Sequence, residues 1–343
     1  MSRSPLPTAE AVARQFLARR PAHRLPWRWD ASMALVGLGH LMAVSPSART
    51  RHLGDLQDYQ TTHLRTRSIA LADHCLGAQS SLFLLRWRDD AEARFATQRV
   101  VDYLRTAPEN DLGVLDHLGR HAWYRRLLRP GAWVDSMMMY VVTAAKVGAA
   151  LELSWLEQMA VRHAERFCEH LQTSTGLFRH AKLMPDQRAP VHWLRGNGWA
   201  AVCLVELAGR SRVLDSALQR QAEALLDAQA SNGLWPTIVD APTSAHETSG
   251  SALVAYALAK AVRKGVLGSK AERAADAAWA GLCGELVSRN RSLTLGGISA
   301  PSVPGPRAVY RFTPRFAGLA YGVGAFCMLA AELSRHATEG AGS

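Results

Sequence analysis

Two aspartates at the start of long apolar segments are the first candidates for acid–base chemistry. Asp73 lies in LADHCLG and Asp135 lies in GAWVDSMMM, each at or near the first turn of an expected helix. An aspartate in that position commonly caps helix N–H groups, which is the plainer interpretation of either residue alone. Each also stands close to a histidine or a tryptophan, so burial could separate the two pKa values into an acid and a base. Asp116, in VLDHLGR, is a third carboxylate that competes for this role.

The stretch VHWLRGNGWAAV has a high density of aromatic and polar side chains next to glycines. Its candidate ligand-binding residues are Trp193, Arg195, Asn197 and Trp199. Indole rings with polar neighbours suit stacking on a sugar face, and a guanidinium can bind a carboxylate through two parallel hydrogen bonds. The glycines permit a tight helix entry and the close approach of a ligand. The tryptophans could equally belong to the core.

Two histidines extend this set of candidate binding residues. His117 in GVLDH and His180 in GLFRH each follow a glycine by four residues, at corresponding places of a repeat. This shared position favours a ligand-binding role as much as a structural one. Trp133 and Met139 flank Asp135 and could line the same cleft or fill the core. The histidines do not have the spacing of a zinc site, and we predict no metal and no other cofactor.

The elements that must position these residues are helices. Apolar residues recur every three or four positions in segment after segment, and few windows alternate as strands do. The pattern predicts an all-α fold of about twelve helices. Their approximate ranges are 8–19, 31–44, 53–65, 70–86, 91–106, 135–148, 153–172, 197–209, 213–229, 247–263, 269–287 and 317–334.

A weak repeat arranges these helices in pairs. Polar residues, a glycine and then apolar residues recur around Gly113, Gly176, Gly233 and Gly296, at a spacing of roughly sixty residues. A helix hairpin with its connection has about this length, so the chain holds six pairs. We predict that they close into an (α/α)6 barrel with six inner and six outer helices, an open solenoid being the alternative. The inner helices would then start at one mouth, where their dipoles favour an anionic ligand.

Composition limits the class of protein further. The chain has 343 residues, 48% of them hydrophobic and 20% charged, and a formal net charge of +11. The positive charge favours an acidic partner, but no basic helix stripe indicates a nucleic-acid-binding module. Five scattered cysteines and the lack of a long apolar run predict a cytoplasmic protein without a membrane span. We expect neither nucleic acid nor membrane as a partner, and a monomer or homodimer.

Several of these motifs resemble those of the unsaturated glucuronyl and rhamnogalacturonyl hydrolases, glycoside hydrolase families 88 and 105. The matching stretches are WVDSMMM, GLFRH, HWLRGNGWA, GLWPTIVDAP with HETSGSALVAYALAK, and YGVGAFCMLAAE. The resemblance covers the chain from about Trp27 to Glu332 and implies an (α/α)6 barrel. We predict a single catalytic domain over residues 1–343, with a short irregular N-terminal extension at 1–25. The resemblance further implies removal of a 4,5-unsaturated uronic acid from the non-reducing end of oligosaccharides that polysaccharide lyases leave behind.

The resemblance also implies roles for particular residues. Asp135 matches the catalytic acid/base, and Asp73 matches the second carboxylate. The implied binding residues are His117, Trp133, His180, Trp193, Arg195 and Trp199, to which the residue pattern adds Met139 and Asn197. A 4,5-unsaturated uronoside is a vinyl ether, so a carboxylic acid can protonate C4 while water adds to C5.

Two questions stay open at this point. The basic segment between residues 119 and 131 either recognises an acidic oligosaccharide or is a solvated loop; its arginines are Arg120, Arg125, Arg126 and Arg129. The alternative functions are a carbohydrate-binding protein of the same fold without activity and a glucuronyl hydrolase acting on other acidic glycans. The presence of both Asp73 and Asp135 argues against the non-catalytic alternative.

Overall fold

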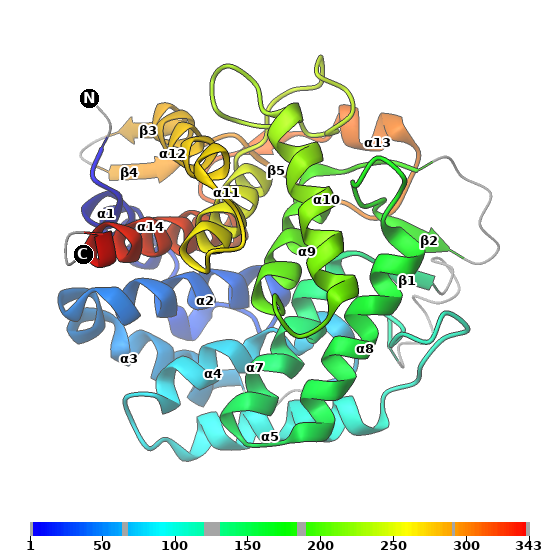
Figure 1. The fold of residues 1–343 in the computed structure, drawn as a ribbon. Helices are drawn as coiled ribbons and strands as arrows, with labels where there is room; N and C mark the ends of the chain where they lie inside the picture. The colour runs from blue at the N-terminus through cyan, green and yellow to red at the C-terminus, as the bar shows by residue number, and fades with distance from the viewer. Residues whose placement is uncertain (1–2, 64–67, 120–130, 184–189, 290–291, 341–343) are drawn as a thin grey trace.

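The computed structural model describes residues 3–63, 68–119, 131–183, 190–289 and 292–340, and helices account for most of them (Figure 1). Six inner helical segments form a closed ring, because each contacts the next and the last returns to the first. In ring order they are α2 (Trp29–Val44), α4 (Gly77–Leu85), the π-helical η3 (Met137–Val142) continued by α7 (Thr143–Ala150), α9 (Leu194–Glu206), α11 (Thr248–Arg263) and α14 (Ala320–Gly340). The prediction of a closed barrel is confirmed.

Six further helices surround this ring. Each outer helix packs against the inner segment next to it in the chain, except that α1 packs against α14 and so joins the two ends of the chain. The outer helices are α1 (Pro5–Arg19), α3 (Pro46–His63), α5 (Ala91–Thr106), α8 (Ser154–Leu171), α10 (Arg212–Ala228) and α12 (Ser269–Gly284). The described chain is therefore an (α/α)6 barrel.

The patterns of apolar residues explain which helices are inner and which are outer. In α9 every residue from Leu194 to Val205 is buried, as is every residue of α2 from Ala31 to Met42. In α10 the buried residues instead recur at three- and four-residue spacing, from Leu214 to Leu225. A helix that is buried all round belongs inside, whereas an amphipathic helix covers the core with one face.

Small residues allow the inner helices to approach one another closely. A Cβ atom at Gly37 of α2 would overlap the backbone of Gly324 in α14, and a Cβ at Gly324 would overlap the carbonyl group of Met33. The two backbones therefore touch directly, which is possible only without side chains at these positions. This contact closes the ring between its first and last inner helices.

The glycine repeat corresponds to a repeated turn in three of its four places. Gly113, Gly176 and Gly233 all have positive φ, and each donates its N–H to the carbonyl oxygen three residues earlier. At the fourth place the positive φ belongs to Gly297, while the N–H of Gly296 donates to Glu285 at the base of a hairpin. The fourth place therefore does not form the same turn.

The N-terminal extension at 1–25 is not irregular throughout, since it contains the helix expected at 8–19. Residues 5–19 form α1, whose buried side chains include Val12, Phe16 and Leu17 at helical spacing against α14. The 3₁₀ turn η1 (Ala22–Arg24) then leads to α2. The extension is helical because its apolar residues share one face that the barrel covers.

Short elements that the periodicity did not predict lie between the helices. They are the 3₁₀ turn η2 (Ala72–His74), the short helix α13 (Arg307–Arg311), and three antiparallel pairs: β1 (Gly131–Trp133) with β2 (Ala181–Leu183), β3 (Leu286–Arg289) with β4 (Ser292–Leu295), and β5 (Ile298–Ser299) with β6 (Arg315–Phe316). In Figure 1, β1, β2 and α13 lie on the side of the molecule opposite the two chain ends.

Two sequence-based expectations concern the environment of the chain. Within the described ranges, no helix has both the length and the apolar character needed to cross a bilayer. All five cysteines lie among the described residues and are free thiols, four of them buried. They pack as small apolar side chains.

Candidate active site

Backbone pairing places Asp135 beside His180. Asp135 lies between β1 and the π-helical η3, and β1 pairs with β2 so that Trp133 is opposite Ala181. The Val134 N–H donates to the carbonyl oxygen of His180 at 2.9 Å. Single π-helical turns occur frequently at functional sites, where they change the direction in which side chains point. The sequence pattern predicted one continuous helix here.

The side chains of Asp135 and His180 form a close pair. His180 Nε2 lies 3.0 Å from Asp135 Oδ2, and the other ring nitrogen, Nδ1, lies 2.6 Å from the hydroxyl oxygen of Tyr310. The His180 side chain is 2% exposed and that of Asp135 is 17% exposed. The carboxylate can therefore reach a ligand while its histidine partner is sealed inside the protein.

A second pair forms around Asp73. The turn η2 is tied to His117 because the Ala72 N–H donates to the His117 carbonyl oxygen at 3.2 Å. His117 Nε2 then lies 3.5 Å from Asp73 Oδ1, and His117 Nδ1 lies 2.9 Å from the hydroxyl oxygen of Ser136. Since Ser136 follows Asp135 directly, His117 connects the two carboxylate pairs.

Aromatic rings surround the two histidines. The rings of His117 and Trp133 are stacked, with centroids 4.5 Å apart and planes 16° from parallel. The rings of His180 and Trp193 have centroids 4.4 Å apart. The structure therefore brings six of the candidate residues together in one cluster, the carboxylate cluster: Asp73, His117, Trp133, Asp135, His180 and Trp193.

The two carboxyl groups differ in acidity. Burial raises the pKa of Asp73 to about 6, with Asp135 and Asp30 adding to the increase and His117 opposing it. Burial also acts to raise the pKa of Asp135, but His180, His117 and Arg195 together outweigh it and hold that pKa below its usual value. Near pH 5 the pair therefore carries one proton, mainly on Asp73.

Arg195 is fully buried at the edge of this cluster. Its guanidinium lies between the rings of Trp193 and Tyr321. It donates hydrogen bonds to the Ser299 carbonyl and hydroxyl oxygens at 3.0 and 2.8 Å and to the Ala300 carbonyl oxygen at 3.0 Å. Glu247 Oε1, also buried, lies 3.8 Å away. Arg195 thus holds the segment after β5 against α9, which the motif alone did not indicate.

Asn197 has a structural position. Its amide accepts a hydrogen bond from the Phe178 N–H at 2.8 Å and donates to the carbonyl oxygens of Phe178 and Trp193 at 2.9 and 3.0 Å. These bonds fasten the turn that carries His180 to the start of α9. Asn197 is fully buried and outside the carboxylate cluster.

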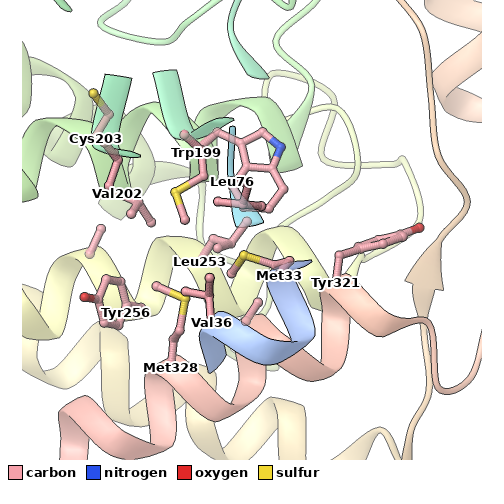
Figure 2. Close-up of a cluster of buried hydrophobic side chains, with 14 of the residues drawn as sticks. Met33, Val36, Leu76, Trp199, Val202, Cys203, Leu253, Tyr256, Tyr321 and Met328 are labelled. Atoms are coloured by element: carbon pink, nitrogen blue, oxygen red, sulfur yellow. The ribbon is translucent and has the colours of Figure 1, made fainter. Parts of the chain in front are cut away.

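Trp199 and Met139 lie in the hydrophobic core, 0% and 1% exposed. Figure 2 shows Trp199 among Met33 of α2, Leu253 of α11 and Leu76, the residue directly before α4. The glycines of the motif have a packing role as well, because a Cβ at Gly198 would overlap the side chain of Leu253. The side chains of Trp199 and Met139 therefore both belong to the main hydrophobic core.

Three remaining expectations concern acidic, metal-binding and basic residues. Asp116 is 2% exposed and its Oδ1 accepts a hydrogen bond from the Leu118 N–H at 3.1 Å, as in a capped turn. Over the described part of the chain, no group of three or more His, Cys, Asp and Glu side chains is arranged to hold a metal ion. The arginines of the basic segment, which occupy positions 120–129, fall outside the described residues.

Sequence reasoning missed several residues around the site. Tyr310 on α13 contacts His180, Ser136 contacts His117, and Ser299 receives Arg195. Ser136 could have been considered because it follows Asp135. Tyr310 stands 130 residues after His180 in a segment without periodicity, so nothing in the sequence pairs the two.

The class of this protein, a glycoside hydrolase, follows from its match to a family profile, with which the (α/α)6 barrel and the clustered carboxyl groups agree. The profile of Glycosyl Hydrolase Family 88 matches residues 9–337, and the chain belongs to that family. A curated relative is the unsaturated rhamnogalacturonyl hydrolase YesR of Bacillus subtilis, 27% identical over 244 residues that cover 68% of this chain and 70% of the relative.

Solved structures show the same fold. A family 105 glycoside hydrolase of C. acetobutylicum has a TM-score of 0.83 at 19% identity, covering 94% of this chain and 98% of that one. The unsaturated glucuronyl hydrolase of Bacillus sp. GL1 has a TM-score of 0.72 at 14% identity, covering 98% and 97%. At these identities the likeness establishes the barrel and not the substrate.

Proposed function

We propose that this protein removes a 4,5-unsaturated uronic acid from the non-reducing end of acidic oligosaccharides produced by polysaccharide lyases. The observation that carries this proposal is the pairing of Asp73 and Asp135, each with a histidine, in one cluster at the start of inner segments. The unsaturated rhamnogalacturonyl hydrolase named above supports the same substrate class. The helical segments η3 and α9 begin at Met137 and Leu194, close to Asp135 and Trp193, and helix N-termini favour a uronate carboxylate electrostatically.

The chemistry is hydration of the C4=C5 vinyl ether. A proton adds to C4, water adds its oxygen to C5, and the proton lost by that water returns to a carboxylate. The resulting hemiketal opens and the bond to the leaving sugar breaks. Because the reacting bond is the double bond, the separation of the two carboxylates does not predict retention or inversion as it does in ordinary glycosidases.

We assign proton donation to C4 and then water activation to Asp135. Below about pH 6 the free protein has Asp135 ionised and Asp73 protonated, because their pKa values are shifted in opposite directions. Asp135 can donate a proton to C4 only after it has received one, so Asp73 passes its proton to Asp135 in the loaded site and then orients the sugar hydroxyls. His117, which lies between Asp73 and Ser136, keeps the pair together.

Binding is assigned to the aromatic and cationic residues around the carboxylates. Trp133, stacked on His117, and Trp193, whose ring is tilted against that of His180, are assigned to contact the sugar. Arg195 acts on the uronate carboxylate chiefly through its positive charge and by holding residues 299–300 in place. We do not assign substrate contacts to Met139 and Trp199, because both are buried in the core. We do not assign one to Asn197 either, because its side-chain amide is hydrogen-bonded to backbone groups.

A substrate panel tests the proposal. Unsaturated disaccharides derived from pectin, ulvan and glycosaminoglycans are incubated with the protein, and the ultraviolet absorbance of the conjugated double bond is followed. Loss of absorbance with a pectin-derived substrate supports a rhamnogalacturonyl hydrolase, and loss only with glycosaminoglycan fragments supports a glucuronyl hydrolase. Binding without any loss of absorbance across the panel supports the non-catalytic alternative.

We also infer a single catalytic domain that acts in the cytoplasm as a monomer or homodimer. One hydrophobic core runs from Ala9 to Ala331, which supports a single folding unit. Free, buried cysteines are compatible with a reducing compartment. Light scattering of the purified protein and fractionation of cells that produce it test the two remaining points.

A further inference from the structure

We propose that Tyr310 is a positioning residue that holds His180 in the tautomer protonated on Nε2, so that the imidazole donates a hydrogen bond to Asp135. Tyr310 lies on α13, outside the inner and outer rings. Its hydroxyl oxygen is 2.6 Å from His180 Nδ1, and His180 Nε2 is 3.0 Å from Asp135 Oδ2. The kinetic consequence rests on the proposed function, whereas the tautomer does not.

The direction of this chain of hydrogen bonds follows from its two ends. The Gly305 N–H donates to the Tyr310 hydroxyl oxygen at 3.1 Å, an interaction that leaves the phenolic O–H able to donate to His180 Nδ1. A neutral imidazole has one donor and one acceptor nitrogen. With Nδ1 accepting, Nε2 carries the proton, and an ionised carboxylate can only accept it.

Burial makes the choice of tautomer costly to reverse. The Tyr310 residue is 1% exposed and the His180 side chain is 2% exposed. The opposite tautomer would direct the Nε2 lone pair at the carboxylate of Asp135, in a place where water cannot compensate. A buried polar atom without a hydrogen-bond partner destabilises the protein. The hydrogen bond with Tyr310 therefore favours the His180 tautomer that is protonated on Nε2.

The fold holds Tyr310 from two sides. Arg307, on the same short helix, forms an ion pair with Asp240 at 3.2 Å, and Asp240 lies 3.1 Å from His192 Nδ1. The Tyr310 ring belongs to a small buried apolar group with Val191, Trp193 and Ile238. Residues far apart in the chain thus fix the hydroxyl group relative to His180.

The groups that act on the Asp135 carboxylate are His180, His117, Arg195 and Asp73. Of these four residues, His180 forms a hydrogen bond with the Asp135 carboxylate. Removing the Tyr310 hydroxyl leaves all four side chains and their number of charges in place. Its effect on Asp135 is therefore transmitted by the orientation and tautomer of His180.

The protein contains a matched control for this arrangement. The Leu115 N–H donates to the Tyr140 hydroxyl oxygen at 3.2 Å, that oxygen is 3.0 Å from His163 Nδ1, and His163 Nε2 is 3.1 Å from Glu109 Oε1. Tyr140→Phe therefore removes a hydroxyl with the same neighbours, but from a histidine that does not contact either site carboxylate.

The experiment reads the tautomer of His180 directly by ¹⁵N NMR of the histidine side chains, with His180 assigned by the loss of its signals in His180→Gln. We expect wild-type Nε2 to be protonated and Nδ1 to be an acceptor. Because Asp135 still accepts from Nε2, Tyr310→Phe should raise the share of the Nδ1-protonated form without making it dominant, and Tyr140→Phe should leave His180 unchanged. Identical tautomer populations in Tyr310→Phe and the wild type overturn the proposal. A wild-type His180 protonated on Nδ1 alone, or on both nitrogens at neutral pH, overturns the proposal, and that result needs no variant to fold.

The kinetic arm measures kcat and KM on whichever unsaturated disaccharide the wild type hydrolyses. Tyr310→Phe should lower kcat roughly 10- to 100-fold while KM changes far less. An unchanged kcat in a variant with an altered His180 tautomer overturns the positioning role. A wild type inactive on every unsaturated substrate contradicts the proposed function instead, and the NMR result still decides the tautomer.

Discussion

The guanidinium carbon of Arg195 lies 4.4 Å from the centroid of the Trp193 ring, two positions earlier in the chain. The same group lies 4.7 Å from the ring of Tyr321. This stacking, together with hydrogen bonds to Ser299 and Ala300, makes the arginine a support for the wall of the site. Arg195 is therefore expected to affect both stability and binding.

Arg195→Ala should lower the free energy of unfolding by about 3–5 kcal/mol, because it leaves the buried carboxylate of Glu247 without its counter-charge. KM for an unsaturated disaccharide should rise far more than kcat falls. Urea unfolding and steady-state kinetics measure the two effects. Arg14→Ala, at an exposed position of α1, is the control and should change stability by no more than about 0.5 kcal/mol. A fully stable Arg195→Ala protein would contradict the assigned packing.

Asp135→Asn should lower kcat by roughly 10²- to 10⁴-fold, because an amide can neither supply the proton for C4 nor accept one from water. The amide has nearly the same shape, so the circular dichroism spectrum should match that of the wild type. Activity is measured by the loss of ultraviolet absorbance of the substrate. Turnover close to the wild-type rate would remove Asp135 from the acid/base role.

The pKa of about 6 for Asp73 predicts a pH dependence of the reaction. The active form requires Asp73 protonated and Asp135 ionised, so kcat/KM should be constant below that pKa and fall as pH rises through it. The lower limb should appear only below the ordinary carboxyl range, since the pKa of Asp135 is lowered. A profile measured from pH 4 to pH 8 checks this, and a rate independent of pH up to 8 would contradict it.

Asp73→Asn should stabilise the protein at neutral pH. An aspartate whose pKa is raised in the folded state contributes stability that is present below its unfolded pKa and is lost as pH rises through about 6. The amide avoids this loss, so the variant should gain roughly 1–3 kcal/mol at pH 7.5, allowing for the 25% exposure of the side chain. Denaturant unfolding at pH 7.5 and pH 5 measures the gain, which should shrink at the lower pH. An equal gain at both pH values would show that burial of the Asp73 charge is not its cause.

Gly37→Ala should destabilise the barrel by about 1–3 kcal/mol, because its new methyl group would overlap the backbone of α14 at Gly324. Gly54→Ala is the matched control. Gly54 lies within α3 with no atom within 4 Å of its added Cβ, so alanine there should stabilise the helix by up to ~1 kcal/mol. Thermal unfolding of the two variants compares them, and equal effects would mean that the contact between α2 and α14 is not close-packed.

The architecture was largely readable from the sequence, because the spacing of apolar residues reports how each helix is buried. The all-round apolar pattern of α9 and the one-sided pattern of α10 are both visible in the amino-acid string. The starts of most inner helices also follow from local signals, but Asp73 lies in the 3₁₀ turn η2 and not in the first turn of α4, which begins only at Gly77. The meeting of Asp73 and Asp135 depended on the inference that the inner helices begin at one end.

Only the tertiary structure decided which candidate residues share the site. Trp193 and Trp199 look alike in the motif, yet Trp193 contacts the ring of His180 and Trp199 lies in the core. Tyr310 carries no sequence signal at all, since its place beside His180 depends on α13 and the ion pair of Arg307. Hydrophobic periodicity is a local property that survives in the sequence. The protonation and orientation of a buried side chain depend on neighbours that only folding brings together, and so they cannot be read from it.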